Sequence, residues 1–130
     1  MSRREGIVYG VAALRAAARG DRVLWAVHRA VLHAGIVPVV PAAAIAEAHR
    51  TEARQDRLSQ LLQGVEVEPL TGEVARRVGE LAARADTTDL LAVTVAELAE
   101  RRNCAVVAAR QTALRQAAGL LGHQLVLYAL

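Results

Sequence analysis

The residues of this chain whose types could do chemistry are mainly carboxylates. Glu47 lies in a helical stretch that follows an apolar run, and Asp86 and Asp89 stand three residues apart ahead of another helical stretch. Two further positions, Gly10 and Arg110, each follow an apolar run that has the character of a strand. Carboxylate oxygens are the ligands that Mg²⁺ prefers, and a bound Mg²⁺ can activate water for hydrolysis. Metal-assisted hydrolysis is therefore the first chemistry to consider.

The elements that must position these residues are short β-rich runs that alternate with longer helical stretches. The predicted strands are residues 7–9, 36–40, 65–67, 105–108 and 124–128. The predicted helices are residues 11–18, 22–33 capped by Asp21, 41–47, 58–62, 71–83 and 87–101 capped by Asp86. Strands separated by helices favour a parallel sheet with right-handed crossovers. We therefore expect an α/β fold in one domain over residues 1–130, with a central parallel sheet of about five strands.

A parallel sheet of this kind has its functional crevice at the carboxyl ends of its strands. The residues expected at that crevice are Gly10 after the first strand, Glu47 after the second, Asp86 and Asp89 before the fourth, and Arg110 after the fourth. The sequence therefore predicts that these five positions lie near one another.

The composition limits the classes of protein to which the chain can belong. A length of 130 residues is enough for one domain with its own core. Hydrophobic residues make up 54% of the chain, but charged or polar residues interrupt every apolar run before the ~18 to 20 residues that a membrane span needs. No signal-peptide pattern opens the chain, so we expect a soluble, cytoplasmic protein with no membrane partner. The net charge of +3 is compatible with RNA binding, although an ordinary solvated surface is the commoner meaning.

Other chemistries lack their sequence patterns. Zinc-site spacing is missing among the four histidines, His28, His33, His49 and His123. The two serines have no nucleophile-elbow context, and no glycine-rich phosphate loop is present. The lone Cys104 lies in an apolar run and is predicted to be a buried structural thiol. We expect no resident cofactor.

Taken together, the motifs resemble the PIN-domain family, especially the VapC-like toxin ribonucleases, over nearly the whole chain. Residues 6–21 are similar to the family's first strand and helix, and residues 58–69 to a later helix and strand. Val39-Val40-Pro41-Ala42 leads to the family's second acid at Glu47, and Asp86-Thr87-Thr88-Asp89 matches its paired acids. The resemblance implies a three-layer α/β/α PIN-like fold. It also implies that Glu47 and Asp89 are metal ligands for Mg²⁺ or Mn²⁺ and that Asp86 is a catalytic residue beside them.

The sequence departs from the family pattern at two of the four principal acidic positions. Gly10 and Arg110 stand where the family has acids after the first and fourth strands. A unit charge about 4 Å from a cation contributes on the order of 4 kcal/mol at an effective dielectric near ~20, so Arg110 should repel a metal. The resemblance therefore implies a catalytically impaired or inactive homologue that acts by binding or dimerisation. The alternative is an active Mg- or Mn-dependent endoribonuclease toxin with a reduced site.

Two interpretations of these residues remain open. In the first, Arg110 takes the place of the metal and pairs with Glu47, Asp89 or both. In the second, each residue serves its own segment, with Glu47 paired with Arg50 or solvated. Asp86 and Asp89 would then be a helix cap and its first-turn acid, and Arg110 would begin a surface helix.

The apolar content and Arg110 indicate which partners the chain should bind. The short apolar helices at residues 11–18 and 42–48 suggest more hydrophobic surface than one core can bury, which favours a homodimer. The resemblance implies an antitoxin-like partner that presents a basic group to the acids. Because Arg110 is already there, we expect loose or no binding of that partner.

Overall fold

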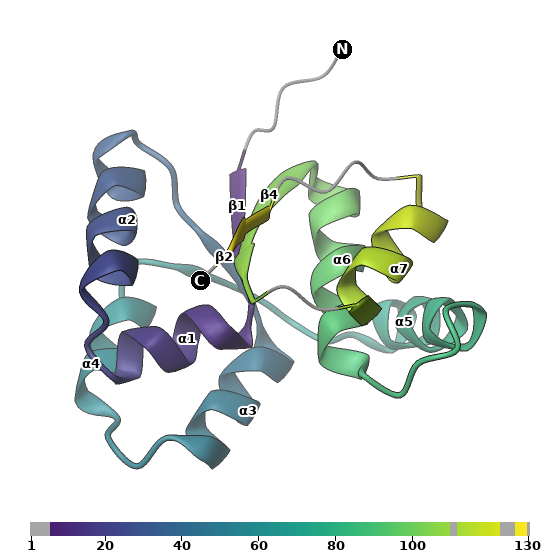
Figure 1. Cartoon of the computed structure of the whole chain (residues 1–130), viewed down its shortest axis with the longest axis horizontal. Coiled ribbons are helices and arrows are strands. Elements are labelled where there is room, and N and C mark those ends of the chain that lie inside the picture. The colour runs from purple at the N-terminus through teal and green to yellow at the C-terminus, as the bar shows by residue number, and fades with distance from the viewer. Residues whose placement is uncertain (1–5, 110–111, 123–126, 130) are drawn as a thin grey trace.

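The computed structural model describes residues 6–109, 112–122 and 127–129. The strands are β1 (Gly6–Tyr9), β2 (Val39–Pro41), β3 (Glu66–Glu68), β4 (Cys104–Ala108) and β5 (Leu127–Ala129). The helices are α1 (Val11–Ala18), α2 (Arg22–His33), α3 (Ala42–Thr51), α4 (Asp56–Leu62), α5 (Gly72–Arg84), α6 (Leu90–Arg102) and α7 (Thr112–Leu120). The sheet is parallel and has the order β3-β2-β1-β4-β5 (Figure 1). The expected α/β class with a parallel sheet is confirmed.

Two apolar clusters cover the two faces of the sheet. Neighbouring strand residues alternate between them, as the period of two in a strand requires. Val8, Val39 and Val106 pack with α5, α6 and α7. Tyr9, Val40 and Val107, the next residue along each strand, pack with α1, α2, α3 and α4. Figure 1 shows the two groups of helices on opposite sides of the strands.

The predicted strand at residues 36–40 is wrong at its start, because β2 begins at Val39. Gly35 has a positive φ of 78° and ends α2. The N–H of Ile36 then donates to the carbonyl of Val31 at 3.1 Å, which satisfies a free carbonyl at the end of the helix. The backbone of Ile36 therefore serves the helix end.

The predicted capping role of Asp86 is also wrong. Asp86 has a φ of 52° and lies just after α5. Its N–H donates to Ala83, and the N–H of Thr87 donates to Ala82, which is the hydrogen-bond pattern that closes a helix with a left-handed residue. Asp86 thus ends α5, and Asp89 caps α6 by accepting a hydrogen bond from the N–H of Ala92 at 3.1 Å.

The most apolar helix lies deep in the fold, as predicted. Residues 92–99 of α6 are all buried, including the charged side chain of Glu97. Arg101 pairs with Glu97 across one helical turn, with its Nε 2.7 Å from the carboxylate. Cys104 is buried, and this burial raises the pKa of its thiol. No helix within the described ranges combines the length and the apolar character needed to cross a bilayer.

A buried hydrogen bond joins α2 to β1. The Tyr9 hydroxyl lies 2.9 Å from Nδ1 of His28, whose residue is only 4% exposed. Burial raises the pKa of Tyr9 to about 12, so the hydroxyl keeps its proton. Which of the two groups donates this hydrogen bond depends on the tautomer of the His28 ring. Burial also lowers the pKa of His28, which keeps the ring neutral.

We predict that His28 makes stability depend on pH. Its folded pKa is lowered, so the unfolded chain binds more protons below the ordinary pKa of about 6.5. The free energy of unfolding should therefore fall as the pH drops from about 7 to 5, by at most about 1.4 kcal/mol per pH unit. Urea titrations across this range should show the fall in the unchanged protein and a flatter profile in His28→Gln. Equal slopes in both proteins would contradict this role of His28.

Candidate functional site

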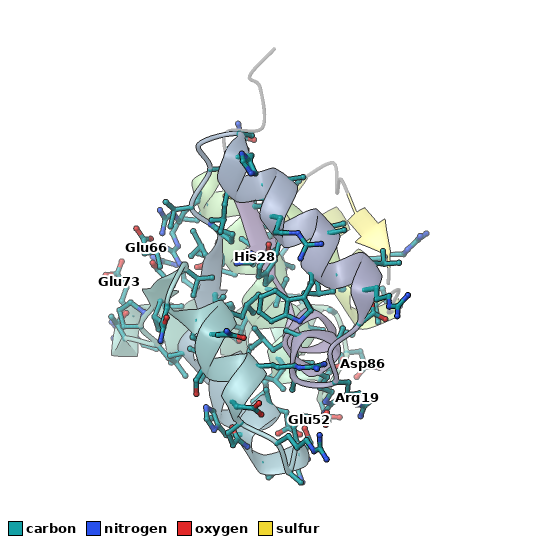
Figure 2. All side chains as sticks on the ribbon, turned by 90° about the vertical axis from the view of Figure 1, so that its left-hand side faces the viewer. Arg19, His28, Glu52, Glu66, Glu73 and Asp86 are labelled. Atoms are coloured by element: carbon teal, nitrogen blue, oxygen red, sulfur yellow. The ribbon has the colours of Figure 1, made fainter. Side chains whose placement is uncertain are left out.

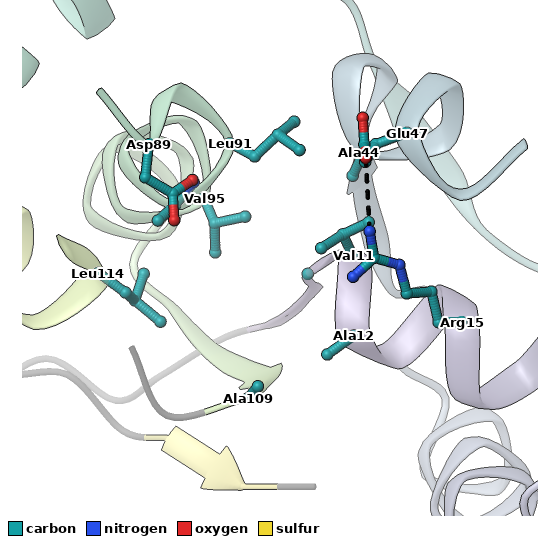
Figure 3. A pocket seen from close by; sticks show the side chains of 12 residues that line it. Val11, Ala12, Arg15, Ala44, Glu47, Asp89, Leu91, Val95, Ala109 and Leu114 are labelled. Atoms are coloured by element: carbon teal, nitrogen blue, oxygen red, sulfur yellow. Dashed lines mark hydrogen bonds and ion pairs between the residues drawn. The ribbon is translucent and has the colours of Figure 1, made fainter. Parts of the chain in front are cut away.

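A cavity of about 200 Å³ lies at the carboxyl edge of the sheet. Gly10 follows β1 and Ala109 follows β4, while Glu47 comes from α3 and Asp89 from the start of α6. The other lining residues are Val11, Ala12, Arg15, Ala44, Leu91, Ala92, Val95 and Leu114. The structure thus brings Gly10, Glu47 and Asp89 together (Figure 3). Arg110 lies outside the described residues, so its predicted pairing with the acids stays a prediction.

Glu47 is bound by two arginines. Nε of Arg50 donates to its Oε2 at 3.1 Å, and the Arg50 guanidinium also contacts its Oε1. Nη2 of Arg15 donates to Oε1 at 3.4 Å from the other side. The hydrogen bonds from Arg50, with the charges of Arg50 and Arg15, lower the pKa of the Glu47 carboxyl. The predicted pairing of Glu47 with Arg50 is confirmed, and both carboxylate oxygens are occupied.

The contact with Arg15 is one of several side-chain hydrogen bonds that join α1 to α3. Nε of Arg15 donates to the Thr51 hydroxyl at 3.1 Å. One turn further along α1, Arg19 holds the carboxylate of Glu52 with two hydrogen bonds, at 2.8 and 3.2 Å. Glu47 therefore takes part in joining two helices. The sequence did not identify Arg15, because its partner lies 32 residues away and only the fold brings them together.

Asp89 caps α6, and its side chain and backbone both make hydrogen bonds there. Its Oδ1 accepts the hydrogen bond from Ala92, and its own N–H donates to the hydroxyl of Thr87 at 3.1 Å. The cap satisfies one of the free N–H groups in the first turn of α6. Asp86 is exposed and does not line the cavity, so its predicted place beside Asp89 in the site is not observed. His49 is likewise exposed and outside the lining.

These donors do not fit a Mg²⁺ site. Figure 3 shows Glu47 and Asp89 on opposite walls, with Arg15 directed at Glu47. Within the described part of the chain, no group of three or more histidine, cysteine, aspartate or glutamate side chains could hold a metal ion. Mg²⁺ gives up its waters reluctantly and needs carboxylates that are free to bind it. A carboxylate that already pairs with two guanidinium groups would have to release both.

The fold leaves no room for an acid at position 10. The N–H of Gly10 donates to the carbonyl of Val107 at 3.0 Å, which holds the start of α1 against β4. A Cβ at Gly10 would lie 2.9 Å from the Cβ of Ala108, closer than two such carbons can approach. The backbone of Gly10, with φ −81°, suits any residue, so the obstacle is the contact itself.

We predict that this contact appears as coupling between two substitutions. Gly10→Ala should lower the free energy of unfolding by about 1–3 kcal/mol through overpacking. Ala108→Gly should lower it by about 1 kcal/mol through the poorer strand propensity of glycine. The double variant should be no less stable than Gly10→Ala alone, because the second change removes the clash. Chemical denaturation of the four proteins measures this, and simple addition of the two losses would show that the contact is not the obstacle.

Comparison with known proteins adds no relative to this geometry. No protein-family model matches the chain, and no curated protein matches it. What the cavity can do therefore rests on the residues that line it.

Proposed function

We propose that this chain is a PIN-like, VapC-like protein whose metal-dependent ribonuclease site is inactive and which acts by binding. The placement of Glu47 and Asp89 in one cavity at the carboxyl edge of the sheet supports the resemblance. Gly10 and Ala109 line the same cavity at the ends of the first and fourth strands and carry no charge. The proposed three-layer fold agrees with helices on both faces of the sheet.

The observation that carries the proposal is the pairing of Glu47 with Arg15 and Arg50. In a working metal site the carboxylates face an ion and are free to bind it. Here two arginines pair with Glu47, so this carboxylate is not free to bind a cation. Because Glu47 and Asp89 both have structural roles, their presence needs no catalytic explanation.

The alternative is an active endoribonuclease with a reduced site. What favours it is that Glu47 and Asp89 still face a common cavity. Asp86 does not join them, so such a site would have two carboxylates, each with a competing partner. We therefore place this alternative second.

Among the proposed partners, RNA is favoured over a second copy of the chain. The homodimer was expected because α1 and α3 are apolar, but the side chains of Ala13, Leu14 and Ala44 from these helices are buried within the domain. Large exposed apolar side chains are instead spread over other segments: Val23, Leu32, Val37, Val67, Leu70, Leu90 and Leu120. None of these seven residues lies in α1 or α3. The homodimer stays a prediction.

Incubation with mixed-sequence single-stranded RNA and millimolar Mg²⁺ or Mn²⁺ tests the proposal. We expect no cleavage, because the donors do not fit the metal. The matched control is Glu47→Gln with Asp89→Asn, which removes both charges while Asn preserves the cap of α6. Cleavage by the unchanged protein that is lost in this variant would contradict the proposal and favour the active alternative. Cleavage that persists in the variant would come from a contaminant.

A further inference from the structure

A second hollow of about 710 Å³ lies on another face of the molecule, between α2 and α4. Its lining residues are Gly20, Arg22, Trp25, His28, Arg29, Leu32, Arg57 and Gln60, and we call it the α2/α4 groove. Figure 2 looks onto this face and shows His28 between the two helices. The groove shares no lining residue with the cavity at the sheet edge.

The α2/α4 groove is lined by three arginines and no acid. Arg22, Arg29 and Arg57 are exposed, and no carboxylate of the described residues forms a salt bridge with them. In the cavity at the sheet edge, by contrast, Arg15 is neutralised by Glu47. The groove therefore has an uncompensated positive charge that would attract an anion.

Arg22 opposes the dipole of its own helix, and Arg57 lies beside it across the groove. Arg22 is the first residue of α2, where a positive charge opposes the helix dipole and an acid would be favoured. Gly20, with a φ of 74°, lies so close to the guanidinium of Arg57 that a Cβ there would collide with it. The guanidinium of Arg57 thus lies against the turn between α1 and α2.

His28 adds a polar group to the floor of the groove. The residue is 4% exposed, and its Nδ1 is occupied by the Tyr9 hydroxyl. The residue lines the groove together with Trp25, and the two rings meet edge to face with centroids 5.8 Å apart. The imidazole thus adds a polar edge to a groove that is otherwise lined by arginine, tryptophan, leucine, glutamine and glycine.

The spacing of the charges selects the kind of anion. Arg22, Trp25, Arg29 and Leu32 recur at helical intervals, so they form a row along one face of α2. Arg22 and Arg29 lie seven residues apart, roughly 10 Å along the helix axis, and Arg57 of α4 lines the same groove. Guanidinium groups bind phosphate with two parallel hydrogen bonds. A ligand with several phosphates in a chain can therefore engage all three arginines at once, each through its own phosphate.

We propose that the α2/α4 groove binds the phosphate backbone of single-stranded RNA. This rests on the proposed function, in which the chain holds RNA without cleaving it, and it places the RNA away from the cavity at the sheet edge. Arg22, Arg29 and Arg57 contact phosphates, and His28 lies on the floor of the groove beneath them. With one aromatic residue besides His28 in the groove, binding depends on the backbone more than on base stacking.

Fluorescence anisotropy with a labelled single-stranded RNA of mixed sequence, in EDTA, tests the site. The test variant is Arg22→Gln, Arg29→Gln and Arg57→Gln together. The matched control is Arg76→Gln, Arg84→Gln and Arg115→Gln, which removes the same charge from exposed positions on α5 and α7. The test variant should bind at least about tenfold more weakly, and its log–log salt slope should be shallower by about 2, the value for three lost single-strand phosphate contacts. Equal weakening of RNA binding in both variants would overturn the assignment of RNA to the α2/α4 groove, while the proposed function would stand.

Trp25 gives a second readout, since it is the one tryptophan in the chain and lines the groove. RNA binding should change its emission, with a midpoint equal to that from anisotropy. Binding without a change in Trp25 emission would place the RNA elsewhere and overturn the proposal. Competition by polyglutamate as strong as by unlabelled RNA would show an acidic-peptide surface instead, which also overturns it. Cleavage of RNA in Mn²⁺ would contradict the proposed function without bearing on the groove.

Discussion

β1 lies between β2 and β4, and its fit against β4 leaves almost no space for side chains at its two ends. The register pairs Gly6 with Cys104, where a Cβ on the glycine would lie 3.0 Å from the sulfur. At the other end Gly10 follows Tyr9, and a Cβ there would meet Ala108 at 2.9 Å. The side chains between them are buried on alternate faces, so β1 cannot shift without exposing part of both clusters. This close approach fixes the centre of the sheet and one wall of the cavity.

The same constraint decides the chemistry of the cavity. Position 10, where the resemblance expects an acid, cannot take a side chain unless β4 moves. The two remaining carboxylates then have roles in the fold: Glu47 joins α3 to α1 through Arg15, and Asp89 begins α6. A carboxylate that stabilises helices still lines the crevice but is not free to bind a metal. The acids of the cavity are thus used for structure, and arginines without a salt bridge lie in the α2/α4 groove.

Part of this could be predicted from the sequence, and the limits have physical causes. Alternating strand and helix signals are local, so the parallel sheet and the approach of Glu47 to Asp89 followed from them. The residue that caps α6 could not be predicted, because Asp86 and Asp89 are both good caps. In the structure Asp86 forms the left-handed turn that ends α5, so Asp89 caps α6. Arg15 depends on how α1 crosses α3, which no local pattern reports. The α2/α4 groove could not be predicted either, because Arg57 on α4 comes near Arg22 and Arg29 on α2 only in the folded chain.

Calorimetric titration of Mn²⁺ into the purified protein tests most directly whether the cavity still binds metal. The pairing of Glu47 with Arg15 and Arg50 predicts no saturable heat up to millimolar Mn²⁺. The Asp89→Asn variant, which keeps the cap of α6, should give the same trace. Saturable binding to the unchanged protein that disappears in Asp89→Asn would show that the carboxylates exchange their partners for a metal. That result would contradict the conclusion that Glu47 and Asp89 are held by the fold and closed to a cation.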